Sequence, residues 1–150
     1  IAFVLFTDFQ STQDFYNDSD VKENSIGTVT VSIKCDAITD RSEAHIPDDG
    51  IILDTTEYEI EEGDTAYSIL CEAAREHKIH YESNGSGNSV YIEGISNIYE
   101  FDFGDLSGWM YFVNGEEMSV SCGDYILSDG DKVEWVYSLA LGDDIEMGRG

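Results

Sequence analysis

The chain has 150 residues, the size of one domain, and its 32 acidic against 7 basic residues give a formal net charge of −25. This charge repels phosphate groups, so it excludes nucleic acid as a partner and argues against docking on anionic lipid. At 41% hydrophobic and 12% aromatic residues, the chain can still bury a core of its own. We therefore expect a monomer that folds alone beneath an acidic surface.

The first 27 residues differ in composition from the remainder. The apolar run at residues 1–6 is far shorter than the roughly 20 residues that a membrane span needs, so no span is expected in the given chain. Residues 7–24 are polar and acidic, without steady periodicity. We expect residues 1–27 to be a leader or spacer, either the remnant of a signal peptide or a partly ordered segment. One domain over residues 28–145 and a tail over residues 146–150 would follow.

Two strands are expected in the first half of this domain. Residues 28–35 alternate polar and apolar side chains and are rich in β-branched residues, which predicts a half-buried strand. Its inward side chains would be Val29, Val31, Ile33 and Cys35. An acidic loop over residues 36–50 leads to a second strand near residues 51–60, and residues 61–64 have the composition of a turn.

A helix is expected over about residues 66–77. Asp64 and Thr65 are both good N-caps for it. Apolar side chains then follow at spacings of three and four, which describes one stripe along a helix. They are Ala66, Ile69, Leu70, Ala73, Ala74 and His77. Because no other helix is expected, the pattern predicts an α+β fold in which a mixed sheet packs on one main helix.

Further strands are expected after the helix. Residues 79–82 and 90–93 flank a loop rich in Gly, Asn and Ser, as in a β-hairpin. Asn114-Gly115 is the dipeptide of a type I′ turn, and the residues before it alternate as a strand. The last strand is expected over residues 132–137.

The last two long strands carry large apolar side chains on both faces. Met110, Phe112 and Val136 would share one face, opposite a row of aromatic residues. If the aromatic face turns toward the helix, these residues are ordinary core residues; if the other face does, their rings are exposed on the surface. Our hypothesis takes the second register, in which the exposed rings can stack on a flat ligand or a sugar. The candidate ligand-binding residues are then Trp109, Tyr111, Asn114, Trp135 and Tyr137.

Motifs for catalysis or metal binding are missing from the sequence. Cys35, Cys71 and Cys122 lack the paired spacing of a zinc ribbon, and they leave open one disulfide with a leftover thiol or three buried thiols. There is no nucleophile elbow and no HExxH motif, so we expect no enzyme. The acidic pairs do not match a calcium loop, so calcium binding remains possible but unsupported, and solubility explains the acidity better.

Residues 108–115 and 124–135 carry a resemblance to a known family. They read GWMYFVNG and DYILSDGDKVEW. Together with the EGDT start of the expected helix and the closing LGDDI, they resemble the bacterial domain of unknown function DUF4430 over residues 28 to about 145. This family is similar in turn to the carboxy-terminal β-domain of the vertebrate cobalamin carriers transcobalamin and intrinsic factor. The resemblance implies a β-grasp fold, exported to the cell surface.

These observations predict a secreted or cell-surface ligand-binding domain without catalytic activity. The resemblance implies a corrinoid of the cobalamin type, or another flat small molecule, as the ligand, with the other half of the site supplied by a separate helical domain in the vitamin carriers. The anionic surface suits a neutral or cationic ligand. The alternative is an interaction module whose sheet edge or aromatic patch binds a protein or a glycan at the cell surface.

Overall fold

The computed structural model describes residues 22–146, so the expected leader at residues 1–27 and tail at residues 146–150 lie mostly outside the described residues. Within this range the chain forms strands, one α-helix and two 3₁₀ turns. In chain order they are β1 (Ser25–Lys34), η1 (Asp36–Ile38), β2 (Ile51–Glu61), α2 (Ala66–His77), β3 (Tyr81–Asn84), η2 (Gly87–Ser89), β4 (Tyr91–Ile95), β5 (Ile98–Tyr99), β6 (Gly108–Val113), β7 (Glu116–Glu117) and β8 (Lys132–Ser138). No helix among residues 22–146 has the length and apolar character to cross a membrane.

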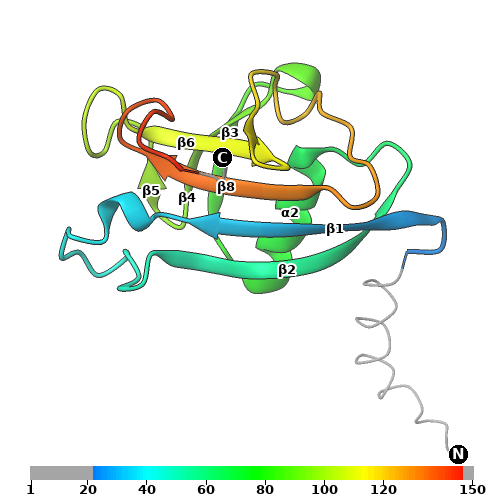
Figure 1. Ribbon diagram of the computed structural model, residues 1–150, viewed down its shortest axis with the longest axis horizontal. Helices are drawn as coiled ribbons and strands as arrows, with labels where there is room; N and C mark the ends of the chain where they lie inside the picture. Colours follow the sequence, from blue (N-terminus) through cyan, green and yellow to red (C-terminus); the bar gives the residue numbers. More distant parts are fainter. Residues whose placement is uncertain (1–21, 147–150) are drawn as a thin grey trace, which may run out of the picture.

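A five-stranded mixed sheet forms the front layer, in the order β2-β1-β8-β6-β7 (Figure 1). β1 and β8 are parallel, with Val31 opposite Val133, while the other neighbouring strands are antiparallel. The helix α2 lies behind this sheet (Figure 1). A parallel pair needs a crossover connection, and here the chain from β2 to β7 supplies it. The expected α+β class, a mixed sheet on one main helix, is confirmed.

The helix α2 has the bounds that its apolar stripe predicts. Thr65 is the N-cap: its Oγ1 accepts a hydrogen bond from the Ser68 amide at 3.0 Å, while the Ser68 hydroxyl accepts one from the Thr65 amide at 2.8 Å. Five residues of the stripe are buried against the sheet, namely Ala66, Ile69, Leu70, Ala73 and Ala74. The helix therefore anchors the core that the sheet covers.

The hairpin predicted around residues 79–93 is present as β3 and β4, which are antiparallel. With β5 these strands form a three-stranded sheet of their own. This second sheet was not expected, because strand patterns give pairing between neighbours in the chain and not the number of sheets. It lies behind β6 and β8 and closes one side of the core (Figure 1).

Candidate functional site

Four aromatic side chains form two cross-strand pairs in the middle of the main sheet. Trp109 lies opposite Tyr137, and Tyr111 lies opposite Trp135, in the antiparallel register of β6 and β8. The Trp109 and Tyr137 rings meet edge to face, with centroids 5.3 Å apart, and the Tyr111 and Trp135 rings stack at 5.1 Å. Both are favourable aromatic geometries, so the rings hold each other in place.

The expectation that these rings line an outer face is wrong. Their exposed fractions lie between 0 and 9%, and they pack in the same buried cluster as the apolar stripe of α2. The other face holds Met110, Phe112 and Val136, which pack against Ile145 in a separate, smaller cluster. The physical reason is area: the large rings need the helix and the second sheet to cover them, whereas one short segment near Ile145 covers the smaller set.

The polar atoms of three of these rings are bound by backbone carbonyls. The Trp109 indole donates to the carbonyl of Ile98 at 2.8 Å, and the Tyr111 hydroxyl donates to that of Val120 at 2.7 Å. The Tyr137 hydroxyl donates to the carbonyl of Tyr99 at 2.8 Å. These bonds attach β5 and the loop at residue 120 to the main sheet, so these polar atoms have a structural role.

Asn114 also has a structural role. It occupies the expected tight turn with φ 54°, followed by Gly115 with φ 85°, the positive pair that a type I′ turn requires. Its amide donates to the Asp131 carboxylate at 2.9 Å, and its oxygen accepts from the amide of Lys132 at 2.9 Å. These bonds join the hairpin to the start of β8, away from the pocket described next.

Three of the predicted site residues come together at a pocket of about 260 Å³, which we call the aromatic pocket. Trp109, Tyr111 and Trp135 line it, together with Ile92 of the second sheet and Val90 just before that strand. Tyr137 and Asn114 are not among the lining residues. Three of the predicted rings thus line one hollow, and the hollow is walled mainly by apolar side chains, as small-molecule sites usually are.

Several of the side chains at this pocket are apolar and exposed. Tyr91, Phe101, Val120 and Leu141 line the pocket and are 43 to 64% exposed. Leu106, which is 50% exposed, lies beside them because its carbonyl accepts the Leu141 amide at 3.1 Å. We call these five side chains the apolar rim. Eight large apolar side chains are exposed within residues 22–146, so the rim holds most of them, which is the distribution of an interaction site rather than of scattered surface residues.

Two residues of the apolar rim have an unusual backbone. Phe101 has φ 70° and Leu141 has φ 54°, a left-handed conformation that bulky side chains rarely adopt. Each such residue costs about 1 kcal/mol or more, and such positions cluster at functional sites. The backbone conformation that holds these two large apolar side chains in water at the pocket mouth therefore lowers the stability of the folded chain.

The electrostatic character of the pocket is acidic. Glu100 lines it beside Phe101, and burial, followed by the nearby Glu93 carboxylate, raises the pKa of Glu100. A carboxylate on a bound ligand would likewise lose hydration on burial and be repelled by neighbouring carboxylates. The site accordingly favours a neutral or cationic guest.

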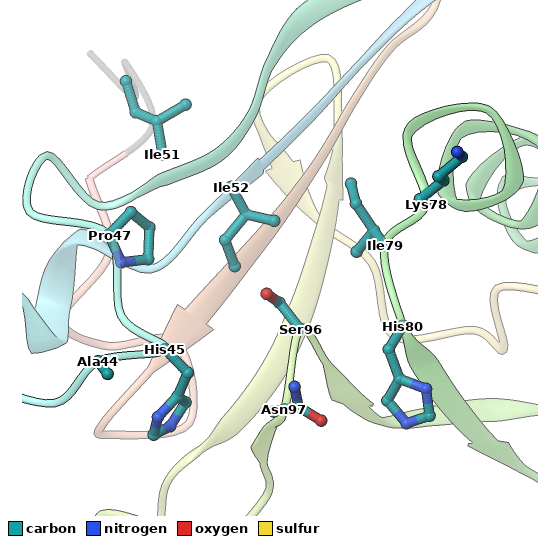
Figure 2. A pocket seen from close by; sticks show the side chains of 10 residues that line it. All are labelled: Ala44, His45, Pro47, Ile51, Ile52, Lys78, Ile79, His80, Ser96 and Asn97. Carbon is teal, nitrogen blue, oxygen red and sulfur yellow. The ribbon is translucent and has the colours of Figure 1, made fainter.

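A larger hollow of about 420 Å³ lies beside the end of α2 (Figure 2). Ile52 and Ile79 lie on opposite sides of it, and His45 and His80 stand on either side of the turn below (Figure 2). No Asp or Glu is among its lining residues. Among the buried side-chain nitrogen and oxygen atoms of residues 22–146, Nε1 of Trp135 is the one without a hydrogen-bond partner, and Trp135 does not line this hollow. The hollow therefore offers a ligand less to recognise than the aromatic pocket does.

The apolar rim was missed by the sequence reasoning. Its residues come from four separate segments that the strand pattern leaves as element ends or loops. The available signal was weak: Phe101 stands between Glu100 and Asp102, an apolar residue where a solvent-exposed connection would be polar. Only the packing of the segments reveals that these side chains gather at one pocket.

The family model for the domain of unknown function DUF4430 matches residues 63–138, or 76 of the 150 residues. The chain belongs to the DUF4430 family. In this DUF4430 domain the matched region runs from the turn before α2 to the end of β8 and contains the aromatic pairs and most of the pocket. No curated protein matches the chain.

Two solved structures are similar to this DUF4430 domain. Haptocorrin, in a crystal structure in complex with Cbi, matches with a TM-score of 0.57 and 19% identity over 81% of this chain. The chain spans only 27% of the length of haptocorrin, and at this identity the likeness shows a shared fold alone. A candidate metal-binding protein from Ruminococcus gnavus ATCC 29149 matches at 14% identity and a TM-score of 0.46, over 75% of this chain and 96% of that one. The predicted resemblance to DUF4430 and to the transcobalamin group is confirmed.

Proposed function

We propose that this DUF4430 domain is a non-catalytic binding domain that holds a flat, largely apolar small molecule in the aromatic pocket. The observation that carries the proposal is the apolar rim: exposed side chains, two of them on strained backbone, surround a pocket walled by Trp109, Tyr111 and Trp135. Such a rim is unfavourable in water and becomes favourable when a guest covers it. We further propose an exported setting at the cell surface, as the family resemblance implies.

The size of the pocket limits what it can enclose. Sites for drug-sized ligands occupy roughly 300–1,000 Å³, and this pocket, at about 260 Å³, is slightly smaller. It can therefore enclose one ring or one edge of a larger ring system, while the remainder lies across Tyr91 and Phe101. A corrinoid would be held by one edge only, and its affinity for this domain alone would be modest.

A corrinoid is the first ligand to test, because the fold is similar to that of part of haptocorrin, which has been crystallised with Cbi. Titration with cyanocobalamin, and in parallel with protoporphyrin, should quench the fluorescence of Trp109 and Trp135 in a saturable way. Phe101→Ala should weaken the binding of the responsive ligand about tenfold, because it removes an aromatic surface from the rim.

The matched control for that experiment is Ile126→Ala. Ile126 is 61% exposed, like Phe101, but it is not among the residues that line the pocket. This variant should bind as the native chain does. No saturable response to either ring system at millimolar concentration would exclude corrinoids and porphyrins as ligands of the pocket.

The alternative function is an interaction module that uses the apolar rim as a docking patch for a protein or a glycan. The observation in its favour is that four exposed apolar side chains line one pocket and a fifth, Leu106, is joined to them through the backbone of Leu141, so that a larger partner could cover them together. A glycan array and a pull-down with the native chain, compared with Phe101→Ala and Ile126→Ala, would test it. If both variants still bind the same protein or glycan, the contact lies elsewhere on the chain and the apolar rim is not the docking patch.

A further inference from the structure

We infer that the guest of the aromatic pocket presents an uncharged hydrogen-bond acceptor, such as a ring nitrogen, a carbonyl or an ether oxygen, and that the indole N–H of Trp135 donates to it. The inference rests on the proposed function, because it concerns the same pocket. It adds the chemical class of the ligand and the residue that selects it.

The observation behind it is an unpaired donor in the core. Among the buried side-chain nitrogen and oxygen atoms of residues 22–146, Nε1 of Trp135 is the one without a hydrogen-bond partner. Trp135 is 2% exposed and lines the pocket. Buried polar groups in native proteins are nearly always bonded, and an orphaned donor is costly enough to call for a functional explanation.

The surroundings of Trp135 hold its ring still. It lies on β8 in the middle of the sheet, where Ile33 of β1 is its neighbour on one side and Tyr111 of β6 on the other. The Tyr111 ring stacks on it at 5.1 Å. A donor fixed by packing loses little entropy when it binds an acceptor, which is the condition for selective recognition.

The other buried side-chain donors of the pocket have acceptors, and the Tyr91 hydroxyl at its exposed side has Glu93 as a hydrogen-bond partner. Trp109 and Tyr111 donate to backbone carbonyls, as described above. The hydroxyls of Ser107 and Ser121 donate to the carbonyls of Gly104 at 2.8 Å and Val90 at 2.6 Å. Trp135 is therefore a lining residue whose buried side-chain donor lacks an acceptor in this structure, and a guest in the pocket would have to bring its acceptor to that N–H.

The charge of the pocket selects the kind of acceptor. A carboxylate or phosphate would be the strongest acceptor for an N–H, but Glu100 lines the same pocket with Glu93 close to it. The chain as a whole carries a formal charge of −25. An anionic acceptor would be repelled both by the carboxylates at the pocket and by the net charge of the whole chain, which leaves uncharged acceptors.

The test uses two bicyclic aromatic probes of similar size. Quinoline carries a ring nitrogen that accepts a hydrogen bond, whereas indole carries an N–H that donates one. Titrated into the ¹⁵N-labelled chain, quinoline should move the Trp135 indole N–H resonance downfield, the direction that hydrogen bonding produces, and indole should not. Trp109 is the internal control, because its N–H is already bonded and the chain contains only these two tryptophans.

Affinity supplies the second measurement. We expect quinoline to bind the native chain about tenfold more tightly than indole, the effect of one hydrogen bond to a buried donor. Trp135→Phe keeps an aromatic ring and removes the N–H, so it should abolish this preference. If Trp135→Phe does not fold, the resonance shift in the native chain decides the question alone.

The outcomes separate this inference from the proposed function. If both probes bind but the Trp135 resonance does not move, or if Trp135→Phe keeps the preference for quinoline, the inference is overturned and the proposed function stands. If quinoline, indole, cyanocobalamin and protoporphyrin all fail to bind, the proposed function is overturned, and this inference with it.

Discussion

At the scale of single residues, the three cysteines are free thiols in different surroundings. Cys35 and Cys122 are buried, whereas Cys71 is partly exposed and its sulfur accepts the Tyr81 hydroxyl at 3.1 Å. Burial, assisted by the Asp36 and Asp49 carboxylates, raises the pKa of Cys35 from 9.0 to about 11. Burial likewise raises the pKa of Cys122 to about 11. Of the two options that the spacing left open, the structure has no disulfide among the three cysteines, and two of the three thiols, not all three, are buried.

We predict that iodoacetamide at pH 8 modifies Cys71 first and leaves Cys35 and Cys122 largely intact. At a pKa of about 11 only about one thiol in a thousand is a thiolate at this pH, and both of these thiols are buried, whereas Cys71 is partly exposed. Mass spectrometry of peptides from the native chain gives the order of modification. In urea all three cysteines should react, and a native chain 2 Da lighter than its reduced form would instead reveal a disulfide.

The same two thiols make stability depend on pH at the alkaline end. In the unfolded chain they release their protons near pH 9, and in the folded chain near pH 11. Their contribution to stability is therefore complete below pH 9 and is lost as the pH rises from 9 to 11.

At the scale of elements, the loop between β7 and β8 links the helix to the pocket. The start of α2 donates to it, from Ala66 to the carbonyl of Tyr125 at 3.1 Å and from Tyr67 to that of Cys122 at 2.9 Å. The same loop supplies Val120 to the apolar rim and accepts the Tyr111 hydroxyl there. The position of one pocket wall thus depends on the first turn of α2.

We predict that Thr65→Ala lowers the free energy of unfolding by about 1 kcal/mol, since it removes the hydroxyl that caps α2. Urea unfolding followed by circular dichroism measures the change. Thr55→Ala is the control, because Thr55 is exposed on β2 and its hydroxyl has no part in the cap. An equal loss in the two variants would show that the cap contributes nothing specific.

At the scale of the whole molecule, the charge is the dominant feature. A formal charge of −25 on 150 residues makes the carboxylates repel each other, and folding brings them closer together. Salt shortens the reach of this repulsion from about 30 Å at 0.01 M to about 8 Å at 0.15 M. The folded state should therefore gain stability as salt is added.

We predict that raising NaCl from 0.01 to 0.5 M at pH 7 stabilises the chain by about 1–2 kcal/mol, seen as a rise in Tm of about 3–8 °C. Calorimetry or thermal circular dichroism measures the rise. The control is the same series at pH 4, where many Asp and Glu side chains are protonated and the effect should shrink. A Tm that does not change with salt at pH 7 would mean that the charges are already balanced by local contacts.

Local patterns in the sequence were sufficient for most of the fold. The alternation from Val29 to Cys35, the stripe and N-cap of α2 and the Asn114-Gly115 turn each predicted an element that the structure contains. These features succeed because helix period, strand period and turn conformation are set by residues close together in the chain. The family resemblance rests on the same local stretches.

The sequence by itself determined the helix, the longer strands, their order and the acidic charge. Which face of β6 and β8 turns toward the helix was decided only by the tertiary structure, since Met110 and Phe112 make one face as apolar as Trp109 and Tyr111 make the other. The apolar rim was also decided there, because its side chains meet only after distant segments have packed. A strand's period is local, but whether a face is covered depends on the area that the rest of the chain can bring against it.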